Sequence, residues 1–249
     1  MKPFILIREY RKTDDIAIQD LIKQYIMSYA LSCFIQVLFR EITLQLVVLM
    51  WAILFIFVGI PLHLCFLSIP VVIFLIVFCV YAVHFNKGIE QANANPKCCF
   101  VAEVYEEPLA MLNNNTEKVE YNLLFNETNG YDVTKLRKKI IGTISVRNHE
   151  SRDKCGWIYR FAMDRKYPYD KVVEGLTRRA IQHCPSQGWY RLETVATECQ
   201  DEVRESYAKL GFNIYQVYHR QIVGSSLSVM KTHLGLDVAK FVHLNSGHS

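Results

Sequence analysis

Two groups of polar residues in the second half of the chain could do chemistry. The first is a basic turn with Arg165, Lys166 and Lys171, whose side chains can bind a phosphate through charge-assisted hydrogen bonds. The second is Glu193, which lies in a predicted strand and could act as a general base. Each group also has a plainer interpretation. The turn could be a solvated basic surface, and Glu193 could form an exposed pair with Arg191.

Composition narrows the remaining chemistry. The net charge of +4 comes without the dense basic stripe of a dedicated nucleic-acid binder, so we expect no nucleic-acid partner. The eight cysteines include no C-x-x-C spacing, and two of them lie in an apolar segment. The adjacent pair Cys98 and Cys99 does not suit a zinc site. We therefore expect reduced, mostly buried thiols and no metal.

One segment of the chain has the composition of a membrane anchor. The 42 residues of Leu44–Phe85 contain no Asp, Glu, Lys or Arg. A spanning helix needs about 20 apolar residues, so the length allows two, with a turn around Gly59–Leu62 where glycine and proline interrupt the pattern. The short first arm also fits a re-entrant hairpin. Basic residues flank both ends of the segment, which favours both ends in the cytosol.

The elements outside this segment alternate between strand and helix patterns. Strands are predicted over Phe4–Tyr10, Cys98–Tyr105, Lys139–Val146, Gly156–Met163, Tyr190–Val195 and Phe212–Tyr218. Helices are predicted over Asp15–Met27, Asp170–Cys184 and Asp201–Leu210. The pattern allows the first of these helices to continue towards Arg40. Polar residues over Glu106–Arg137 indicate a long loop, and Val229–Val242 has a helical pattern. This order predicts an α/β domain with a mixed sheet flanked by helices. If the first strand joins this sheet, the chain enters and leaves the bilayer on one face.

The stretch Glu205-Ser206-Tyr207-Ala208-Lys209-Leu210-Gly211-Phe212 resembles the closing helix and strand of the GNAT acetyltransferases. Three weaker matches support this. Ile7-Arg8 before a Thr-Asp-Asp helix start resembles the fold's first strand and helix. Phe100-Val101-Ala102-Glu103 resembles its second strand, and Ile141-Gly142-Thr143-Ile144 its third. The apolar insertion after the first helix is similar to the membrane-inserted subfamily that includes the cysteine-S-conjugate N-acetyltransferase and N-acetylaspartate synthetase.

The resemblance implies acetyl transfer from acetyl-CoA to an amine, and it assigns roles to residues. Tyr207 matches the family tyrosine that protonates the sulfur of CoA. The main chain of Phe161, Ala162 and Met163 matches the strand that pairs with the pantetheine arm. The resemblance leaves the base open: Glu193 lies in the predicted strand Tyr190–Val195, Glu198 follows that strand, and Tyr159 lies on the strand before it. Of these, Glu193 is the candidate base. The acceptor amine is a small amphipathic molecule or a protein lysine.

The loop that should bind pyrophosphate departs from the family pattern. The family has Arg/Gln-x-x-Gly-x-Gly/Ala at the start of the central helix, and the corresponding residues here are Pro168–Val173. Lys171 and Val173 replace the two glycines, whose missing side chains let the backbone approach the ligand. Asp170 adds a like charge. The candidate ligands of CoA phosphate are therefore Arg165, Lys166, Asp170, Lys171, Val172 and Val173.

Three functional hypotheses follow. The first is a membrane-bound N-acetyltransferase whose catalytic domain faces the cytosol at the endoplasmic reticulum. The second is a pseudoenzyme that keeps the GNAT fold, has lost CoA binding and binds a partner. The third is a membrane structural protein whose domain only caps the hairpin. The predicted organisation is 1–43 for the first strand and helix, 44–85 for the membrane hairpin, 86–220 for the main GNAT domain and 221–249 for the tail. The sequons at Asn114 and Asn126 would matter only in a lumenal domain.

Overall fold

One sheet of eight strands forms the body of the protein in the computed structural model, which describes residues 3–94, 98–106, 121–125, 136–223 and 227–241. The strand order is β3-β1-β2-β4-β5-β6-β8-β7. The strands are β1 (Phe4–Glu9), β2 (Cys98–Glu106), β3 (Asn122–Phe125), β4 (Arg137–Asn148), β5 (Cys155–Met163), β6 (Arg191–Thr197), β7 (Asn213–Val223) and β8 (Leu227–Asp237). The pairs β1–β3 and β5–β6 are parallel and the other pairs are antiparallel. The mixed α/β sheet expected for a GNAT-like domain is therefore present.

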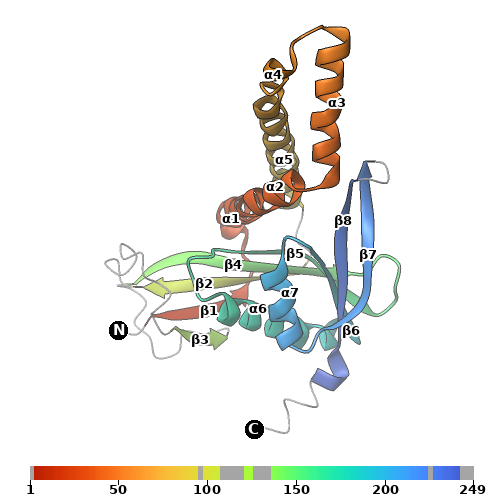
Figure 1. The fold of residues 1–249 in the computed structure, drawn as a ribbon. Helices are drawn as coiled ribbons and strands as arrows, with labels where there is room; N and C mark the ends of the chain where they lie inside the picture. Colours follow the sequence, from red (N-terminus) through yellow and green to blue (C-terminus); the bar gives the residue numbers. More distant parts are fainter. Residues whose placement is uncertain (1–2, 95–97, 107–120, 126–135, 224–226, 242–249) are drawn as a thin grey trace.

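Helices cover both faces of this sheet. They are α1 (Asp15–Ser28), α2 (Ala30–Leu38), α3 (Glu41–Phe57), α4 (Leu62–Cys65), α5 (Ser68–Asn93), α6 (Tyr169–His183) and α7 (Asp201–Lys209), with the 3-10 turns η1 (Lys12–Asp14) and η5 (Pro185–Gln187). Helix α1 packs on one face against β4 and β5, together with the end of α5. Helix α6 packs on the opposite face against β1, β2 and β4 (Figure 1). The predicted continuation of the first helix exists as α2, after a break at Tyr29.

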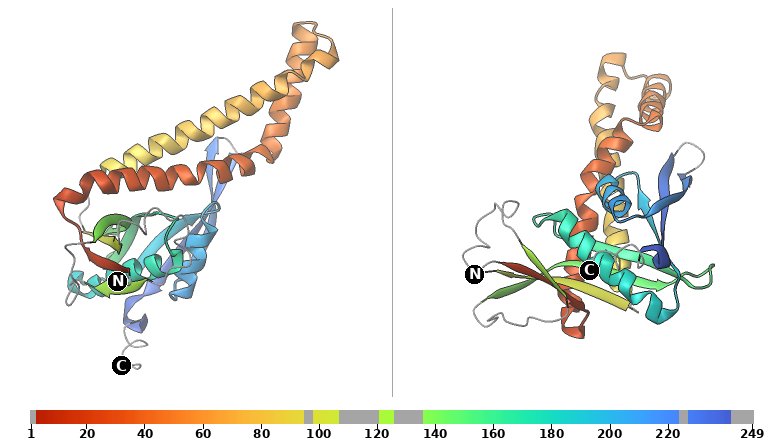
Figure 2. Two further views of the ribbon diagram at one scale, coloured as in Figure 1. Left: turned by 90° about the vertical axis from the view of Figure 1, so that its left-hand side faces the viewer. Right: turned by 90° about the horizontal axis from the view of Figure 1, so that it is seen from below.

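The first strand joins the sheet, as anticipated. The apolar segment therefore leaves the domain and returns to it at neighbouring strands of the sheet. Strand β1 precedes the segment and β2 follows it, and the two pair antiparallel from Phe4 with Tyr105 to Glu9 with Phe100. Both ends of the segment are thus attached to neighbouring strands of one sheet. Helices α3 to α5 rise from the α1 face as a hairpin that extends well beyond the sheet (Figures 1 and 2).

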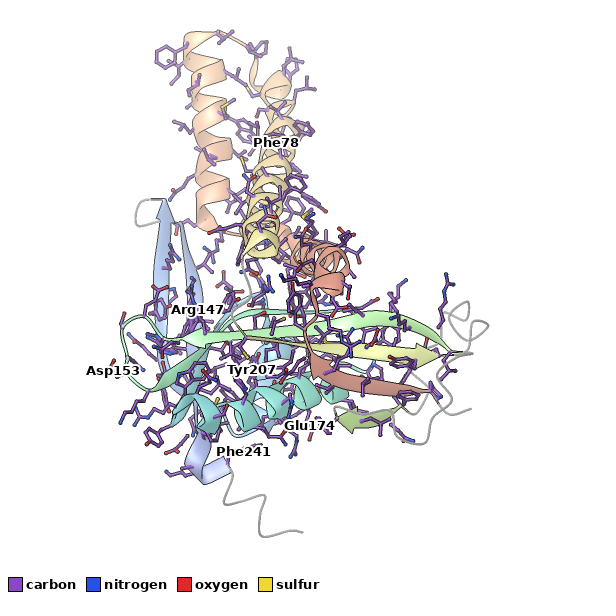
Figure 3. The ribbon with its side chains drawn as sticks, turned by 180° about the vertical axis from the view of Figure 1, so that it is seen from behind. Phe78, Arg147, Asp153, Glu174, Tyr207 and Phe241 are labelled. Carbon is purple, nitrogen blue, oxygen red and sulfur yellow. The ribbon has the colours of Figure 1, made fainter. Side chains whose placement is uncertain are left out.

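The hairpin is apolar on its outside. Its turn falls at the predicted place, because Gly59 adopts a left-handed φ of +71° and Pro61 precedes α4. Exposed large apolar side chains cover both of its arms: Leu44, Leu46, Val48, Leu49, Ile53, Phe55, Ile56, Phe57, Val71, Phe74, Leu75, Phe78, Tyr81, Val83 and Phe85. Phe78 lies on the α5 arm (Figure 3). A surface of this kind is unusual in a protein that meets only water.

Two helical stretches among the described residues are long and apolar enough to cross a membrane. They are Lys12–Leu38 and His63–Asn93, and the shorter Thr43–Phe57 is also apolar. The α1 part of the first stretch buries Ile18, Leu21 and Ile22 in the core of the domain, so length and composition alone do not make it a span. In the second stretch only 17% of the most apolar window is buried within the protein.

The helix predicted over Val229–Val242 is wrong, because most of this segment is strand β8. Strand β8 lies between β6 and β7 and is paired on both sides, from Arg191 with Asp237 to Thr197 with Lys231 on the β6 side. Both faces of this part of β8 are covered, because Thr232 to Leu236 are all buried. Its burial therefore does not follow the period of two that identifies a half-exposed strand. The last strand predicted from the sequence, Phe212–Tyr218, corresponds to β7. Strand β8 follows it in the chain, so β7 is not the last strand.

Two further differences concern the edges of predicted elements. The segment Glu106–Arg137, expected to be one long loop, contains the edge strand β3, which pairs with β1. Helix α5 continues through the polar residues after Phe85 to Asn93 and therefore crosses the predicted boundary between hairpin and domain. The sequons at Asn114 and Asn126 lie outside the described residues.

Candidate active site

A gap between two central strands forms the centre of the candidate site. Strands β5 and β6 pair only over Cys155–Ile158 and Arg191–Thr194, after which the two strands separate. The cause lies in β5, where Tyr159 is an extra residue: Ser145 of β4 pairs with Arg160, but the adjacent Val146 pairs with Ile158. A bulge of this kind bends its strand and increases the local twist. The end of β5 therefore turns away from β6.

The residues predicted to hold the pantetheine arm lie at this bent end of β5. Phe161, Ala162 and Met163 pair with Ile144, Thr143 and Gly142 of β4. Within the described residues no strand pairs with them on the β6 side. The main-chain groups on that side are free to pair with an extended ligand, which is the role that the resemblance implies.

Tyr207 lies beside this free edge. It is carried by α7, which ends at Lys209; Leu210 is the C-cap, and Gly211 then takes a left-handed φ of +89°. The tyrosine ring is 2% exposed and contacts the rings of Phe161 and Phe212, with centroids 6.5 and 5.0 Å away. It lies on the α6 side of the sheet (Figure 3).

The environment of the Tyr207 hydroxyl keeps it protonated. Burial raises the pKa of Tyr207 well above its ordinary value, and the hydroxyl of Thr177 on α6 offsets part of this shift. Neither hydroxyl has a hydrogen bond of acceptable geometry among the described residues. A buried, protonated hydroxyl without a partner can donate its proton to a group that enters the gap.

A cavity of about 600 Å³ opens between the start of α6 and helix α7. Its lining residues are Arg165, Tyr167, Pro168, Tyr169, Asp170, Lys171, Glu202, Glu205, Ser206 and Lys209. The N-terminus of α6 points into this region, and helix N-termini favour anions because of their free N–H groups and macrodipole. This is the place expected for the pyrophosphate of CoA.

The charges in this cavity are balanced. Three basic side chains (Arg165, Lys171 and Lys209) face three acidic ones (Asp170, Glu202 and Glu205). Arg165 pairs with Glu202 at 3.4 Å, and Lys209 pairs with Asp170 at 3.5 Å and with Glu205 at 3.4 Å. An incoming phosphate must therefore compete with carboxylates for most of these cations.

Asp170 already places a negative charge at the helix terminus. It lies in the first turn of α6, and its carboxylate accepts a hydrogen bond from the Ser206 hydroxyl at 3.2 Å. Val172 and Val173 follow with fully buried side chains, so only their main chain could contact a ligand. The Nζ of Lys171 contacts the main-chain oxygen of Tyr121 at 3.5 Å, and Lys166 is exposed. The loop that replaces the family glycines is thus a structured part of the domain.

Glu193 lies in β6, away from this cavity and on the other face of the sheet. The interpretation as an exposed pair with Arg191 is wrong, because Glu193 is 0% exposed. One carboxylate oxygen accepts from Arg152 Nη1 at 2.6 Å, and the other lies 2.9 Å from Nε2 of His233. Sequence reasoning missed both partners. Arg152 lies between the strands predicted over Lys139–Val146 and Gly156–Met163, and His233 lies in Val229–Val242, which has a helical pattern.

The described residues form neither a metal cluster nor a disulfide. Among the described side chains, no group of three or more His, Cys, Asp or Glu is placed to hold a metal ion. The eight cysteines form no disulfide.

Comparisons with known proteins give one family match. Residues 96–212 match the family model described as "Acetyltransferase (GNAT) family". No curated protein sequence matches the chain at a significant level.

Several solved structures resemble the chain at low identity. An N-acetyltransferase from Staphylococcus aureus Mu50 has 10% identity, a TM-score of 0.47 and coverage of 94% of this chain and 98% of its own. An IAA acetyltransferase from Bacillus cereus has 14% identity, a TM-score of 0.38 and coverage of 61% and 83%. A spermidine/spermine N-acetyltransferase from Vibrio cholerae, solved in mutant forms, has 11% identity, a TM-score of 0.40 and coverage of 67% and 80%.

Proposed function

We propose that the protein is a membrane-anchored N-acetyltransferase that uses acetyl-CoA as its acetyl donor and a primary amine as acceptor. The observation that carries the proposal is the free edge of Phe161–Met163 with the buried hydroxyl of Tyr207 beside it, in the gap between β5 and β6. The family match over residues 96–212 supports the same activity. The apolar insertion after the first helix further supports a place in the membrane-inserted GNAT subfamily.

The proposed reaction needs two contributions from these residues. The strand edge of Phe161–Met163 orients the pantetheine arm by main-chain pairing, so that the thioester lies in the gap. The acceptor nitrogen then bonds to the thioester carbon, and the carbon–sulfur bond breaks. Tyr207 gives its proton to the departing thiolate, which needs a donor that is still protonated at the working pH. The raised pKa of Tyr207 satisfies that condition.

We propose that the hairpin of α3 and α5 anchors the domain in the endoplasmic reticulum membrane with the domain in the cytosol. The pairing of β1 with β2 supports both ends of the hairpin on one side. Basic residues before and after the apolar segment support the cytosolic side. Glycans on Asn114 or Asn126 of the native protein would contradict this orientation, because only lumenal sequons are modified.

A pseudoenzyme is the second candidate, and one observation favours it. The cavity at the start of α6 is electrically balanced and contains Asp170 where a phosphate would bind. Calorimetric titration of acetyl-CoA into the full-length protein in nanodiscs separates the two candidates, with ADP as the control ligand. Saturable micromolar binding supports the enzyme. A folded sample that does not bind acetyl-CoA supports the pseudoenzyme.

The acid role of Tyr207 gives the first prediction. Tyr207→Phe should lower kcat by about 10²-fold while acetyl-CoA affinity stays within a factor of two, because only the proton donor is removed. The wild-type rate should not fall between pH 8 and about pH 10 through loss of this proton, because burial raises the pKa of Tyr207. Release of free CoA thiol, measured with tryptamine, octylamine and a lysine peptide as acceptors, reports the rate.

Tyr190→Phe is the matched control, since Tyr190 is exposed at the end of the loop before β6. It should behave like the wild type. A Tyr207→Phe enzyme with full activity would remove the acid role and leave the fold-level proposal standing.

A further inference from the structure

The Glu193 cluster lies on one defined face of the sheet. Glu193 is in register with Trp157 of β5 and Gly235 of β8, and Val195 is in register with His233. Residues that face each other across paired strands project to the same side of a sheet, and residues two apart on one strand do so too. Trp157, Glu193, Val195 and His233 therefore share a face.

This face is opposite to the one that holds the donor cavity. Leu192 precedes Glu193 and so points the other way, towards Gly156 and the ring of Trp189, which follows α6. Tyr207 and the cavity between α6 and α7 lie on this α6 side. Glu193 and His233 therefore lie on the opposite, α1 side. The apolar hairpin rises from this side of the sheet (Figure 1).

The positions of the two faces set the direction of attack. A donor held in the α6–α7 cavity occupies one side of the gap between β5 and β6. A nucleophile must approach a planar thioester carbon from above or below its plane, and the α1 side is the one that the donor leaves open. A group that takes the acceptor's proton must therefore be reachable from the face of Glu193 and His233.

Glu193 itself is poorly placed to take that proton. Both of its oxygens are engaged, one by Arg152 Nη1 at 2.6 Å and the other by the His233 ring at 2.9 Å. The arrangement has a consequence for His233. With Glu193 accepting from Nε2–H, the neutral ring carries its proton on Nε2 and its lone pair on Nδ1. Among the described residues, Nδ1 has no hydrogen-bond partner.

The surroundings of His233 suit a binding site for an amine. The side chain is 11% exposed, so it is largely shielded but reachable. The rings of Trp157 and Tyr215 flank it with centroids 5.7 and 6.0 Å away, both edge-on. Tyr215 is itself partly exposed, which leaves an aromatic border around the histidine.

We propose that His233 is the general base of the acetyl transfer and that Glu193 is the residue that positions it, an inference that rests on the proposed function. As the acceptor nitrogen bonds to the thioester carbon, its proton passes to Nδ1 of His233. The carbon–sulfur bond breaks, and the thiolate takes the proton of Tyr207. Proton transfer through water from the imidazolium to the tyrosinate restores both residues, so the net products are an amide and a thiol.

The test compares His233→Ala and His233→Asn with His219→Ala in nanodiscs, with tryptamine as the acceptor probe. His219 is an exposed histidine on β7 and serves as the matched control. Loss of a general base should lower kcat by about 10²-fold or more in both His233 variants. Acetyl-CoA affinity by calorimetry should stay within a factor of two, and added imidazole should restore part of the rate of His233→Ala. His219→Ala should match the wild type.

Glu193→Gln tests the positioning role. It should lower kcat with KM for tryptamine unchanged, and Glu193→Asp should recover part of the loss. A His233→Ala protein as active as the wild type would overturn the proposal. So would a His233→Ala protein that loses acetyl-CoA binding and gains nothing from imidazole, because that result indicates a structural role.

A failure of the proposed function gives a different result. A wild-type protein that binds acetyl-CoA but transfers to none of tryptamine, octylamine and the lysine peptide would overturn the proposed function together with the role of His233. An active wild type with an equally active His233→Ala would overturn the role of His233 alone.

Discussion

At the scale of residues, Asp170 lies where the proposed donor's phosphates would bind. The N-terminal turn of α6 offers N–H groups and a favourable dipole for an anion, and the chain supplies one of its own there. Ser206 and Lys209 both contact that carboxylate, so it is held in place. A bound pyrophosphate would have to share Lys209 with it.

Asp170→Asn should therefore strengthen acetyl-CoA binding. Removing one like charge near the phosphates is worth about 1 kcal/mol at a solvent-exposed site, or about a 5-fold decrease in Kd. The gain should shrink at high salt, because ions screen exposed charges. Calorimetry at two ionic strengths measures both effects.

Glu174→Gln provides the comparison, because Glu174 lies on the same helix outside the cavity and pairs with Arg178. It should leave the affinity unchanged. If Asp170→Asn binds acetyl-CoA no better than the wild type, the phosphates do not lie at the start of α6.

At the scale of elements, Arg160 connects the apolar hairpin to the strand that carries the candidate site. Its side chain is buried and donates from Nη1 to the main-chain oxygens of Gln91 and Ala94, at 3.1 and 3.0 Å. Its Nε donates to Ser145 of β4 at 3.1 Å. A cation at the end of α5 also complements the negative end of the helix dipole. The hairpin and β5 are therefore held in one arrangement.

Arg160→Met should destabilise the domain by about 2–4 kcal/mol, because it leaves the last carbonyls of α5 buried without donors. Arg191→Met, at an exposed position of β6, should change stability by less than about 0.5 kcal/mol. Denaturant unfolding followed by tryptophan fluorescence measures the two. Equal stabilities would show that the α5 terminus is not fixed through Arg160.

The sequence predicts the elements in the middle of this domain well, and the physical reasons are local. Helix α6 has a clear amphipathic period, and Leu210-Gly211-Phe212 contains the glycine that the turn after α7 needs. Strand β8 was not predicted, because it is buried on both faces and its sequence lacks the alternating pattern of a half-exposed strand. That error also hid His233, whose contact with Glu193 depends on a strand pairing that no local pattern reveals. The bulge at Tyr159 is likewise a property of paired strands.

At the scale of the whole molecule, the hairpin and the open side of the candidate site lie on the same face of the sheet. Helices α1 and α5 cover part of this face, and the hairpin rises from it (Figures 1 and 2). In the proposed orientation this face of the domain is turned towards the bilayer. An acceptor that partitions into the membrane surface would then meet His233 without crossing the domain.

Membrane anchoring by the hairpin gives the last prediction. Phe74 and Phe78 lie one turn apart on α5 and are 68% and 65% exposed, so lipid would surround them. Each charged side chain at the centre of a spanning helix costs roughly 2.5–3.5 kcal/mol on insertion scales. The double variant Phe74→Asp/Phe78→Asp should therefore move much of the protein into the soluble fraction after alkaline carbonate extraction.

Ile16→Asp is the matched control, because Ile16 is 77% exposed but lies on α1 in the domain. It should stay in the membrane fraction like the wild type. If both variants stay in the membrane, the hairpin is not the anchor, and the apolar face of α2 (Leu31, Ile35 and Phe39) would be the next surface to change.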